Sequence, residues 1–371
     1  MARQKSEKAC RVEMTENLFS PENKTLVDVL KGFAGDETPR VVLIADQNIV
    51  VRQPKIGTAI GAYLKAHGIE LAGKPVLLAG GERVKGDNFA SASEVLSALL
   101  DGHLRACDAV LALGGGTILD VAGWAASQVR GGVRLVRIPT TPAAMIDAAF
   151  ATTACLDSAH TKDALVVPSV PSAVIVDPCF AKSVLDAVWR AGMAEAVRLA
   201  AVNDGAFLKF LAANAEKFRS RDFETFSEIV ARSVKLRQKK GAPAFGLWAA
   251  ARLEAMSQYK LPHGYAVAIG ICLDATYALR KEYIKEETRD SICGTIAACG
   301  GLDGLMHSHH LLSQPAQIAI GLDAWELATG SREVELPSGN GKSKVEEDLD
   351  FEVYRAVLKE YVVSAQTDMR K

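Results

Sequence analysis

The segment LALGGGTILDVAG, residues Leu111–Gly123, is the most informative part of the first half of the chain. An apolar segment typical of a buried strand leads into Gly114, Gly115 and Gly116 and then directly into a helical pattern. Glycine lets the backbone come close to a phosphate, and a helix N-terminus offers N–H groups with a partial positive charge. The stretch therefore predicts a turn that binds a dinucleotide pyrophosphate. A tight strand-to-helix turn without a ligand would also fit these residues.

The composition is that of a soluble globular protein. The chain has 371 residues, of which 49% are hydrophobic and 23% charged, and its net charge is −1. Such a charge gives no reason to expect nucleic acid or a membrane as partner. There is no apolar run of about 20 residues, and Met1–Thr15 lacks an apolar signal core. Seven scattered cysteines without a Cys-x-x-Cys pattern suggest reduced thiols, so we expect a cytoplasmic protein.

The first half alternates between strand and helix patterns. Strands are predicted at 40–46, 75–79, 109–113, 134–139 and 173–177, and helices at 56–67, 89–104 and 117–128. This alternation predicts a doubly wound parallel sheet, in which ligands bind at the carboxyl ends of the strands. Asp46, Gly80–Glu82, Gly114–Gly116 and Thr140–Thr141 fall at such ends.

From about Leu185 onward the apolar spacing becomes helical. Helices are predicted at 188–201, 207–218, 223–236, 247–256, 266–279, 292–298 and 354–361, and a mobile loop at 330–348. We therefore expect an α/β dinucleotide-binding domain over residues 1–184 and an all-helical metal and substrate domain over residues 185–371. A cleft between two domains is the usual place for a ligand site.

The glycine turn lacks the G-x-G-x-x-G spacing of a Rossmann fingerprint. Its spacing, with Asp120 four residues after Gly116, instead resembles the dehydroquinate synthase and iron-dependent alcohol dehydrogenase group, which binds NAD at this turn. Gly80-Gly81-Glu82-x-x-Lys85 is similar to the segment whose Glu and Lys hold the NAD ribose in dehydroquinate synthases. Asp46 falls where the group contacts the adenosine half. Thr140 and Thr141, followed by Asp147, resemble the V-P-T-T…D signature of the nicotinamide and substrate pocket.

The resemblance continues into the second half and covers roughly residues 40–280. Arg190–Arg198 is close to R-A-G-x-A-E-x-V-K, whose Glu is a metal ligand, and this implies that role for Glu195. His263–Gly270 resembles H-G-E-A-V-A-I-G, whose His is another ligand. The resemblance implies a homodimeric sugar phosphate cyclase that uses NAD and zinc or cobalt. Such an enzyme oxidises a substrate hydroxyl, eliminates phosphate, takes the hydride back and closes a ring, while the metal acidifies the hydroxyl.

Several positions depart from the family pattern. The middle metal ligand falls at F-G-H, where this chain has Leu247, and leucine has no donor atom. The H-G-E glutamate is Tyr265, and the G-K-N segment is Thr161-Lys162-Asp163. The lysine after the metal glutamate is Arg198. The candidates for catalysis or substrate contact are nevertheless Lys162, Arg198, Asp147 and His263. Of these, Lys162 and Arg198 can neutralise phosphate and carboxylate groups.

Three hypotheses follow. In the first, the chain is a cyclase with another sugar phosphate or polyol substrate and a rebuilt metal site, to which His160, Asp147 or Asp163 contributes. In the second, it is a metal-independent NAD-linked oxidoreductase with Tyr265 or His263 as proton carrier. In the third, it is a catalytically degenerate homologue that binds a nucleotide or a partner. His307, His309 and His310 are expected on a solvated loop rather than at a metal, and Asp147 could also cap a helix.

Overall fold

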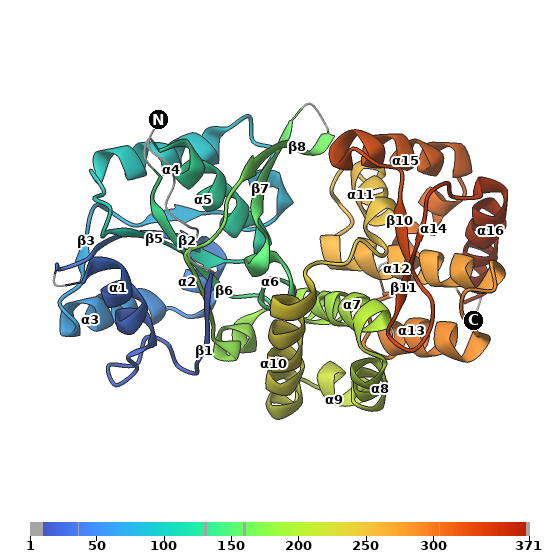
Figure 1. The fold of residues 1–371 in the computed structure, drawn as a ribbon, viewed down its shortest axis with the longest axis horizontal. Coiled ribbons are helices and arrows are strands. Elements are labelled where there is room, and N and C mark those ends of the chain that lie inside the picture. The colour runs from blue at the N-terminus through green and yellow to red at the C-terminus, as the bar shows by residue number, and fades with distance from the viewer. Residues whose placement is uncertain (1–9, 36, 130–131, 159–160, 304, 369–371) are drawn as a thin grey trace. The chain divides into compact units, whose positions relative to one another are not determined.

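The computed structural model describes residues 10–35, 37–129, 132–158, 161–303 and 305–368. The chain divides into two compact units, Met1–Val184 and Leu185–Lys371, which we call unit 1 and unit 2. Figure 1 shows a sheet with helices in unit 1 and mostly helices in unit 2. The predicted fold class, an α/β parallel-sheet domain followed by a largely helical one, is confirmed.

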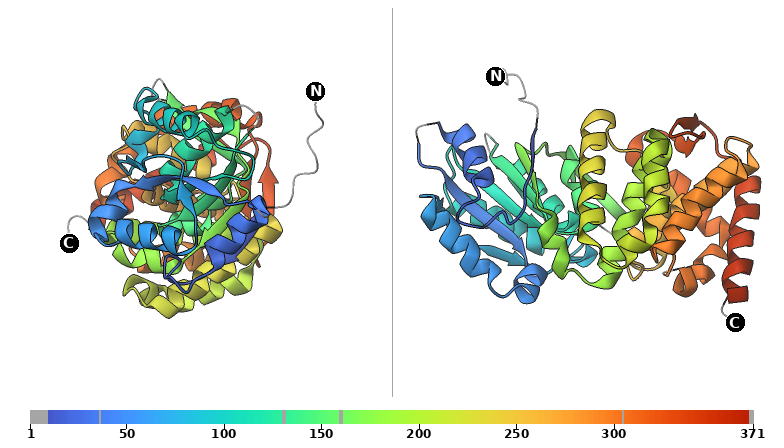
Figure 2. Two further views of the ribbon diagram at one scale, coloured as in Figure 1. Left: turned by 90° about the vertical axis from the view of Figure 1, so that its left-hand side faces the viewer. Right: turned by 90° about the horizontal axis from the view of Figure 1, so that it is seen from below.

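Unit 1 is built on one parallel sheet of seven strands, with helices on both faces (Figure 2). Its order is β1 (Arg11–Met14), β9 (Ala173–Val176), β6 (Arg134–Pro139), β5 (Ala109–Gly114), β2 (Arg40–Asp46) and β3 (Glu70–Leu71), and β4 (Val76–Leu78) also pairs with β2. β5 and β9 are buried throughout, as expected of strands covered on both faces. All pairings are parallel, so the carboxyl ends of β2, β4, β5 and β6 meet at one edge.

Helices on both faces cover this sheet. They are α1 (Thr25–Ala34), α2 (Gln47–Arg52), α3 (Ile56–Ala66), α4 (Ala90–Asp101), α5 (Gly116–Gln128) and α6 (Pro142–Ile146), with short 3-10 turns η1 (Glu82–Val84), η2 (Ala148–Phe150) and η3 (Pro178–Ser183). α4 and α5 lie on one side of the sheet and α1 and α3 on the other (Figure 1). α1 and α3 are joined by the Tyr63 hydroxyl, which lies 3.3 Å from the Val27 nitrogen.

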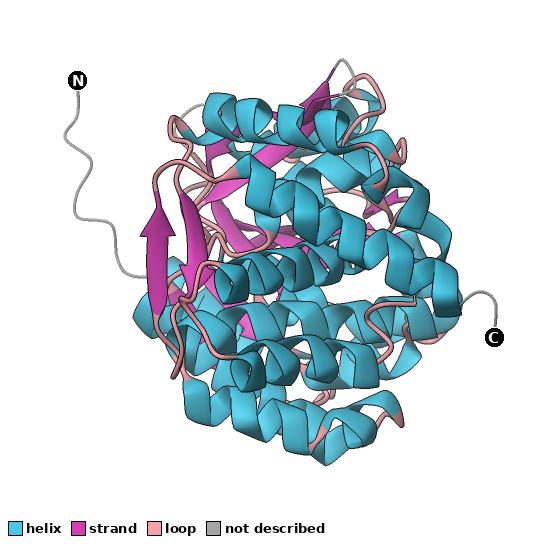
Figure 3. Ribbon diagram, turned by 90° about the vertical axis from the view of Figure 1, so that its right-hand side faces the viewer, coloured by secondary structure: helices cyan, strands magenta, loops and turns pink. Residues whose placement is uncertain are grey.

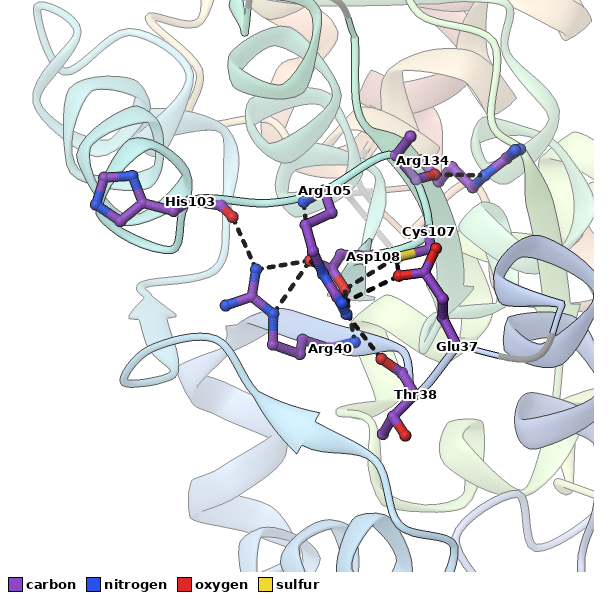
Figure 4. Close-up of polar contacts among 9 residues, drawn as sticks. Glu37, Thr38, Arg40, His103, Arg105, Cys107, Asp108 and Arg134 are labelled. Carbon is purple, nitrogen blue, oxygen red and sulfur yellow. Dashed lines mark hydrogen bonds and ion pairs between the residues drawn. The ribbon is translucent and has the colours of Figure 1, made fainter.

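An ion cluster joins β2 and β5 at the amino end of the sheet, opposite the predicted ligand edge (Figure 4). The Asp108 carboxylate is fully buried and accepts hydrogen bonds from the backbone and the guanidinium of both Arg40 and Arg105. Burial alone would raise the pKa of Asp108, but the Arg105 and Arg40 hydrogen bonds hold it well below its usual value. This cluster holds β2 and β5 together at the end of the sheet that is opposite the predicted ligand edge.

An antiparallel hairpin that the sequence analysis missed follows α6. Its strands are β7 (Thr153–Ser158) and β8 (Thr161–Pro168). Arg137 of β6 is fully buried and donates to the carbonyl oxygens of Ala151 and Ser169, on either side of the hairpin. The Arg137 guanidinium thus ties the hairpin, which carries Lys162 and Asp163, to the central sheet.

Unit 2 is largely helical (Figure 3). Its helices are α7 (Asp186–Asn203), α8 (Gly205–Ala213), α9 (Ala215–Arg219), α10 (Phe223–Lys240), α11 (Leu247–Met256), α12 (His263–Arg280), α13 (Glu286–Ala298), α14 (Leu305–Leu312), α15 (Pro315–Thr329) and α16 (Phe351–Asp368). α12 is the centre of the unit, because every residue from Gly264 to Ala278 is buried. No helix in the described part of the chain is both long and apolar enough to cross a membrane.

Three local predictions for unit 2 were wrong. The segment 330–348 is not a loop, because it contains the hairpin of β10 (Val334–Pro337) and β11 (Ser343–Glu346), which buries Val334 and Leu336. The histidine-containing segment is helical (α14) rather than a loop. The helix predicted at 207–218 is two helices, which meet at Asn214.

Candidate functional site

The turn of unit 1 needs glycine because neighbouring side chains come close to its backbone, and not because its dihedral angles are unusual. Gly115 has φ −73° and is the N-cap of α5, and no side chain caps this helix end. A Cβ atom on Gly115 would lie 3.2 Å from the Thr141 methyl carbon, and one on Gly116 would lie 3.2 Å from Ala148 Cβ. A Cβ atom on Gly114 would collide with Ile118 at 2.6 Å. Glycine at these three positions therefore lets the turn pack closely against Ile118, Thr141 and Ala148, and no side chain caps the α5 N-terminus.

Thr140 and Thr141 lie directly beside this turn. The Thr140 N–H donates to the Gly114 carbonyl at 3.0 Å, which places the end of β6 against the end of β5. The Thr141 hydroxyl accepts from the Ala144 N–H at 3.4 Å and caps α6. The structure thus brings together five predicted cofactor residues: Gly114, Gly115, Gly116, Thr140 and Thr141.

Lys85 is the centre of a second group at the same edge. Its ammonium group is 5% exposed and lies 3.0 Å from an Asp120 oxygen and 2.5 Å from Asp163 Oδ1. Burial opposes the charge, but the surrounding carboxylates, Asp120 foremost, raise the pKa of Lys85 well above its usual value. Desolvation raises the pKa of Asp120, and Lys85 opposes this shift. Lys85 is therefore a permanent cation in this group.

Asp163 and Asp157 are members of the group that the sequence analysis did not assign to the cofactor site. The Asp163 N–H donates to Asp157 Oδ1 at 2.8 Å, and the Asp157 N–H donates to the Lys85 carbonyl at 3.1 Å. Asp163 has φ +50°, a conformation that Asn and Asp adopt more readily than most residues. The G-K-N comparison was the signal that could have identified Asp163.

The remaining predicted residues of unit 1 lie near these groups. Lys162 is 3.7 Å from a Glu82 oxygen. Asp46 is the last residue of β2 and caps α2 by accepting from the Asn48 N–H at 2.8 Å. Only glycine fits at position 80, because a Cβ atom on Gly80 would lie 2.7 Å from the Asp46 carboxylate. Asp147 lies between α6 and η2, and its side chain does not cap η2. A capping role at this turn therefore does not explain the position of Asp147.

In unit 2, a buried polar cluster joins α7, α11 and the start of α12. Glu195 and Arg198, one turn apart on α7, form an ion pair at 2.7 Å, and their side chains are 2% and 1% exposed. His263 Nε2 lies 3.5 Å from Glu195 Oε1, and His263 Nδ1 lies 2.8 Å from Glu254 Oε1. The structure thus unites the predicted residues Glu195, Arg198 and His263 and adds Glu254.

Burial would raise the pKa of Glu195, but the Arg198 guanidinium and then His263 lower it below its usual value. Glu254, 1% exposed, contacts the far nitrogen of His263 and fixes the orientation of the ring. His263 is the most exposed member, with 38% of its side chain accessible. The cluster therefore presents one imidazole to solvent and keeps its ions buried.

These residues do not make up a complete metal site. A catalytic zinc has three protein ligands and an open position. Here Arg198 donates to Glu195 Oε2, Glu254 Oε1 lies against His263 Nδ1, and Glu195 Oε1 faces His263 Nε2. Among the described residues no group of three or more His, Cys, Asp or Glu side chains is arranged to hold a metal ion. His160, a predicted replacement ligand, lies outside the described residues.

The turn before Leu247 is organised by Asp274, which the sequence analysis missed. This carboxylate is fully buried and accepts from the Gly246 N–H at 2.9 Å, the Trp248 indole at 3.2 Å and the Tyr354 hydroxyl at 2.9 Å. Desolvation raises the pKa of Asp274 to about 7. Gly246 has φ +77°, and a Cβ atom there would collide with Ile271. Asp274 thus fixes the start of α11, the helix that carries Glu254.

Comparison with known proteins places the chain in a family. Residues 75–191 match the model for the 3-dehydroquinate synthase N-terminal region, and residues 192–305 match the model for its C-terminal region. A 3-dehydroquinate synthase of Ruegeria sp. (strain TM1040) is 30% identical over 83% of this chain and 85% of its own length. One of Sulfolobus acidocaldarius is 32% identical, but the match spans only 58% of that protein.

Solved structures share the fold over nearly the whole chain. The 2-epi-5-epi-valiolone synthase ValA of Streptomyces hygroscopicus, solved with NAD+ and Zn2+, superposes with a TM-score of 0.83 at 23% identity, covering 98% of this chain and 99% of ValA. A 2-deoxy-scyllo-inosose synthase complexed with carbaglucose-6-phosphate, NAD+ and Co2+ has a TM-score of 0.74 at 18% identity, covering 94% and 96%. The chain therefore belongs to the dehydroquinate synthase family of NAD-dependent sugar phosphate cyclases. The predicted family is confirmed.

Proposed function

We propose that this chain binds NAD on unit 1 and uses it to cyclise a sugar phosphate or a related polyol phosphate. The observation that carries the proposal is the glycine turn before α5. Its helix end has no side-chain cap, and added Cβ atoms would crowd Thr141 and Ala148. Gly114, Gly115 and Gly116 would hold the pyrophosphate there.

The other unit 1 residues would hold the rest of the cofactor and the adjoining substrate. Asp46, beside Gly80, would accept hydrogen bonds from the adenosine ribose, as a carboxylate after a β-strand does in dinucleotide sites. Glu82, Lys85 and Asp120 would line the nicotinamide ribose, with Thr140 and Thr141 next to it. Lys162 and Asp147 are proposed to contact substrate.

NAD, when bound, supplies reversible hydride transfer at the substrate carbon. His263 is proposed to hold the proton of the reacting hydroxyl. Its Nδ1 atom lies 2.8 Å from Glu254 Oε1, and its Nε2 atom lies 3.5 Å from Glu195 Oε1, too far for a strong hydrogen bond. Arg198 would act indirectly, through Glu195. We further propose that the protein is a cytoplasmic homodimer, which light scattering would test.

Calorimetric titration of NAD tests this proposal. The wild type is expected to bind NAD, and Gly115→Asp is expected to lose binding because its carboxylate would crowd Thr141 and repel the pyrophosphate. Gly61→Asp in α3, where an added Cβ meets nothing within 4 Å, is the matched control and should bind as the wild type does. Absence of NAD binding in the wild type would overturn the proposal.

The metal-ligating atoms available in the unit 2 cluster favour a second candidate function, which is the metal-independent oxidation of a polyol by NAD. Glu195 Oε1 and His263 Nε2 face each other in the cluster, and the described residues include no group of three or more His, Cys, Asp or Glu side chains arranged to hold a metal ion. Net accumulation of NADH on incubation with a polyol, without phosphate release, would favour this second candidate over the cyclase.

A further inference from the structure

In the unit 2 cluster, the Arg198 side chain provides the positive charge beside the buried Glu195 carboxylate. Its Nε and Nη2 atoms donate to the same oxygen of Glu195, at 2.8 and 2.7 Å. Both side chains are almost completely buried, so water screens this pair little. A guanidinium carries its charge at every accessible pH. Glu195 is therefore compensated without any further cation.

The Arg198 side chain is also fixed in place at its other end. Its Nη1 atom donates to the Pro243 carbonyl. The neighbouring Ala244 N–H donates to Glu335 at 2.9 Å, and the Gly246 N–H donates to Asp274 at 2.9 Å. The segment that receives Arg198 is thus held by two carboxylates from other elements. Arg198 cannot leave Glu195 without losing this contact as well.

A divalent ion at Glu195 would meet an unfavourable environment. It would share the carboxylate with a buried guanidinium, and like charges a few ångströms apart repel strongly away from water. It would also find few protein donors, since His263 Nδ1 is engaged by Glu254. The residue at the third position implied by the family resemblance is Leu247, which has no donor atom.

We propose that the Glu195–Arg198–Glu254–His263 cluster works without a divalent metal ion, with the Arg198 guanidinium as its permanent cation. Arg198 is a positioning residue, which holds Glu195 beside His263 and does not itself contact substrate. The proposal deepens the proposed function by giving the chemistry of its unit 2 site, but it does not depend on the identity of the substrate.

The test is metal uptake by the full-length protein. Wild type and variants are dialysed against Co2+, then against metal-free buffer, and their cobalt content and visible absorption are measured. The wild type is expected to retain no stoichiometric cobalt. Arg198→Lys/Leu247→His removes the two-point contact with Glu195 and adds an imidazole, so it is expected to take up close to one equivalent. Adding Glu195→Gln to that variant should abolish the uptake.

Stoichiometric cobalt in the wild type that is lost in Glu195→Gln would overturn the proposal. Absence of uptake by both the wild type and the double variant would also overturn it, because Arg198 would then not be what excludes the ion. Circular dichroism checks that each variant folds, and Arg198→Gln/Leu247→His replaces the lysine variant if that one does not. NAD titration of the same samples tests the proposed function separately, since the glycine turn is in unit 1.

Discussion

The Glu254 carboxylate lies 2.8 Å from His263 Nδ1 and is itself 1% exposed. A buried acceptor at one ring nitrogen fixes the hydrogen on that nitrogen and fixes the orientation of the ring. The other nitrogen lies 3.5 Å from Glu195 Oε1, and 38% of the His263 side chain is accessible. This contact makes Glu254 the positioning residue of the imidazole that we propose to handle the substrate proton.

Glu254→Gln should therefore lower kcat by about 10- to 100-fold, by analogy with the loss of a carboxylate that orients a metal-binding histidine. KM should change little, because Glu254 is buried and does not reach the substrate. Steady-state kinetics of NAD-dependent turnover measure both constants. Glu228→Gln on α10, which breaks only an exposed ion pair with Arg232, is the control. An unchanged kcat in Glu254→Gln would contradict the positioning role.

Lys85→Met should lower both stability and NAD affinity. It leaves Asp120 and Asp163 without their shared cation, at an expected cost of about 2–3 kcal/mol in the free energy of unfolding, less than for a fully buried pair because Asp163 is partly exposed. Urea unfolding and NAD titration check the two effects. Lys85→Met/Asp163→Asn should recover part of the lost stability. A double variant no more stable than the single one would argue against the contact between Lys85 and Asp163.

Asp274 should make unfolding dependent on pH. Its pKa is raised from 3.8 to about 7 in the folded state, so the folded protein binds the proton more tightly than the unfolded chain does. Its stabilising contribution is therefore fully present below pH 4 and is lost as the pH rises through 7, on the order of 4 kcal/mol in total. Urea unfolding across this range should show the free-energy difference between wild type and Asp274→Asn falling with pH. A difference independent of pH would contradict the assigned shift.

Asp46 should favour NAD over NADP. A carboxylate that accepts from the ribose hydroxyls repels a 2′-phosphate, and Asp46 is held in place by the Asn48 N–H and the lack of a side chain at Gly80. Asp46→Ser should weaken NAD binding and narrow the preference over NADP, as measured by calorimetry with both nucleotides. The reverse outcome, a wild type that binds NADP as tightly as NAD, would argue against Asp46 as the ribose contact.

Much of the fold could be predicted from apolar periodicity. β2 and α11 begin and end at the predicted residues, since each is a clear strand or helix pattern between turn residues. β7 and β8 were missed because Asp157, Lys162 and Asp163 interrupt their apolar pattern, and the burial of Arg137 beneath the hairpin depends on tertiary contacts. The two-stranded hairpin at 334–346 was missed because its contacts are distant in sequence, such as those of Glu346, which accepts from Tyr277 of α12 and from Tyr283 in the turn after it.

Part of the candidate site could likewise be predicted from the sequence, and part could not. The glycine turn and its threonines could be predicted, because a strand end, a helix start and glycine are all local in sequence. Glu254 and Asp274 could not, since a buried carboxylate in a helix becomes meaningful only when its distant partner is known. Asp163 lies between these cases, because its place in the motif was visible but its contact with Lys85 was not.

We propose that the chain is an NAD-dependent sugar phosphate cyclase. The most direct measurement is phosphate release from a panel of sugar phosphates, with and without NAD, while NADH absorbance is followed in the same samples. One class of substrate should release phosphate only when NAD is present, with no net accumulation of NADH. NADH accumulation without phosphate release, or no NAD-dependent turnover with any substrate, would contradict it.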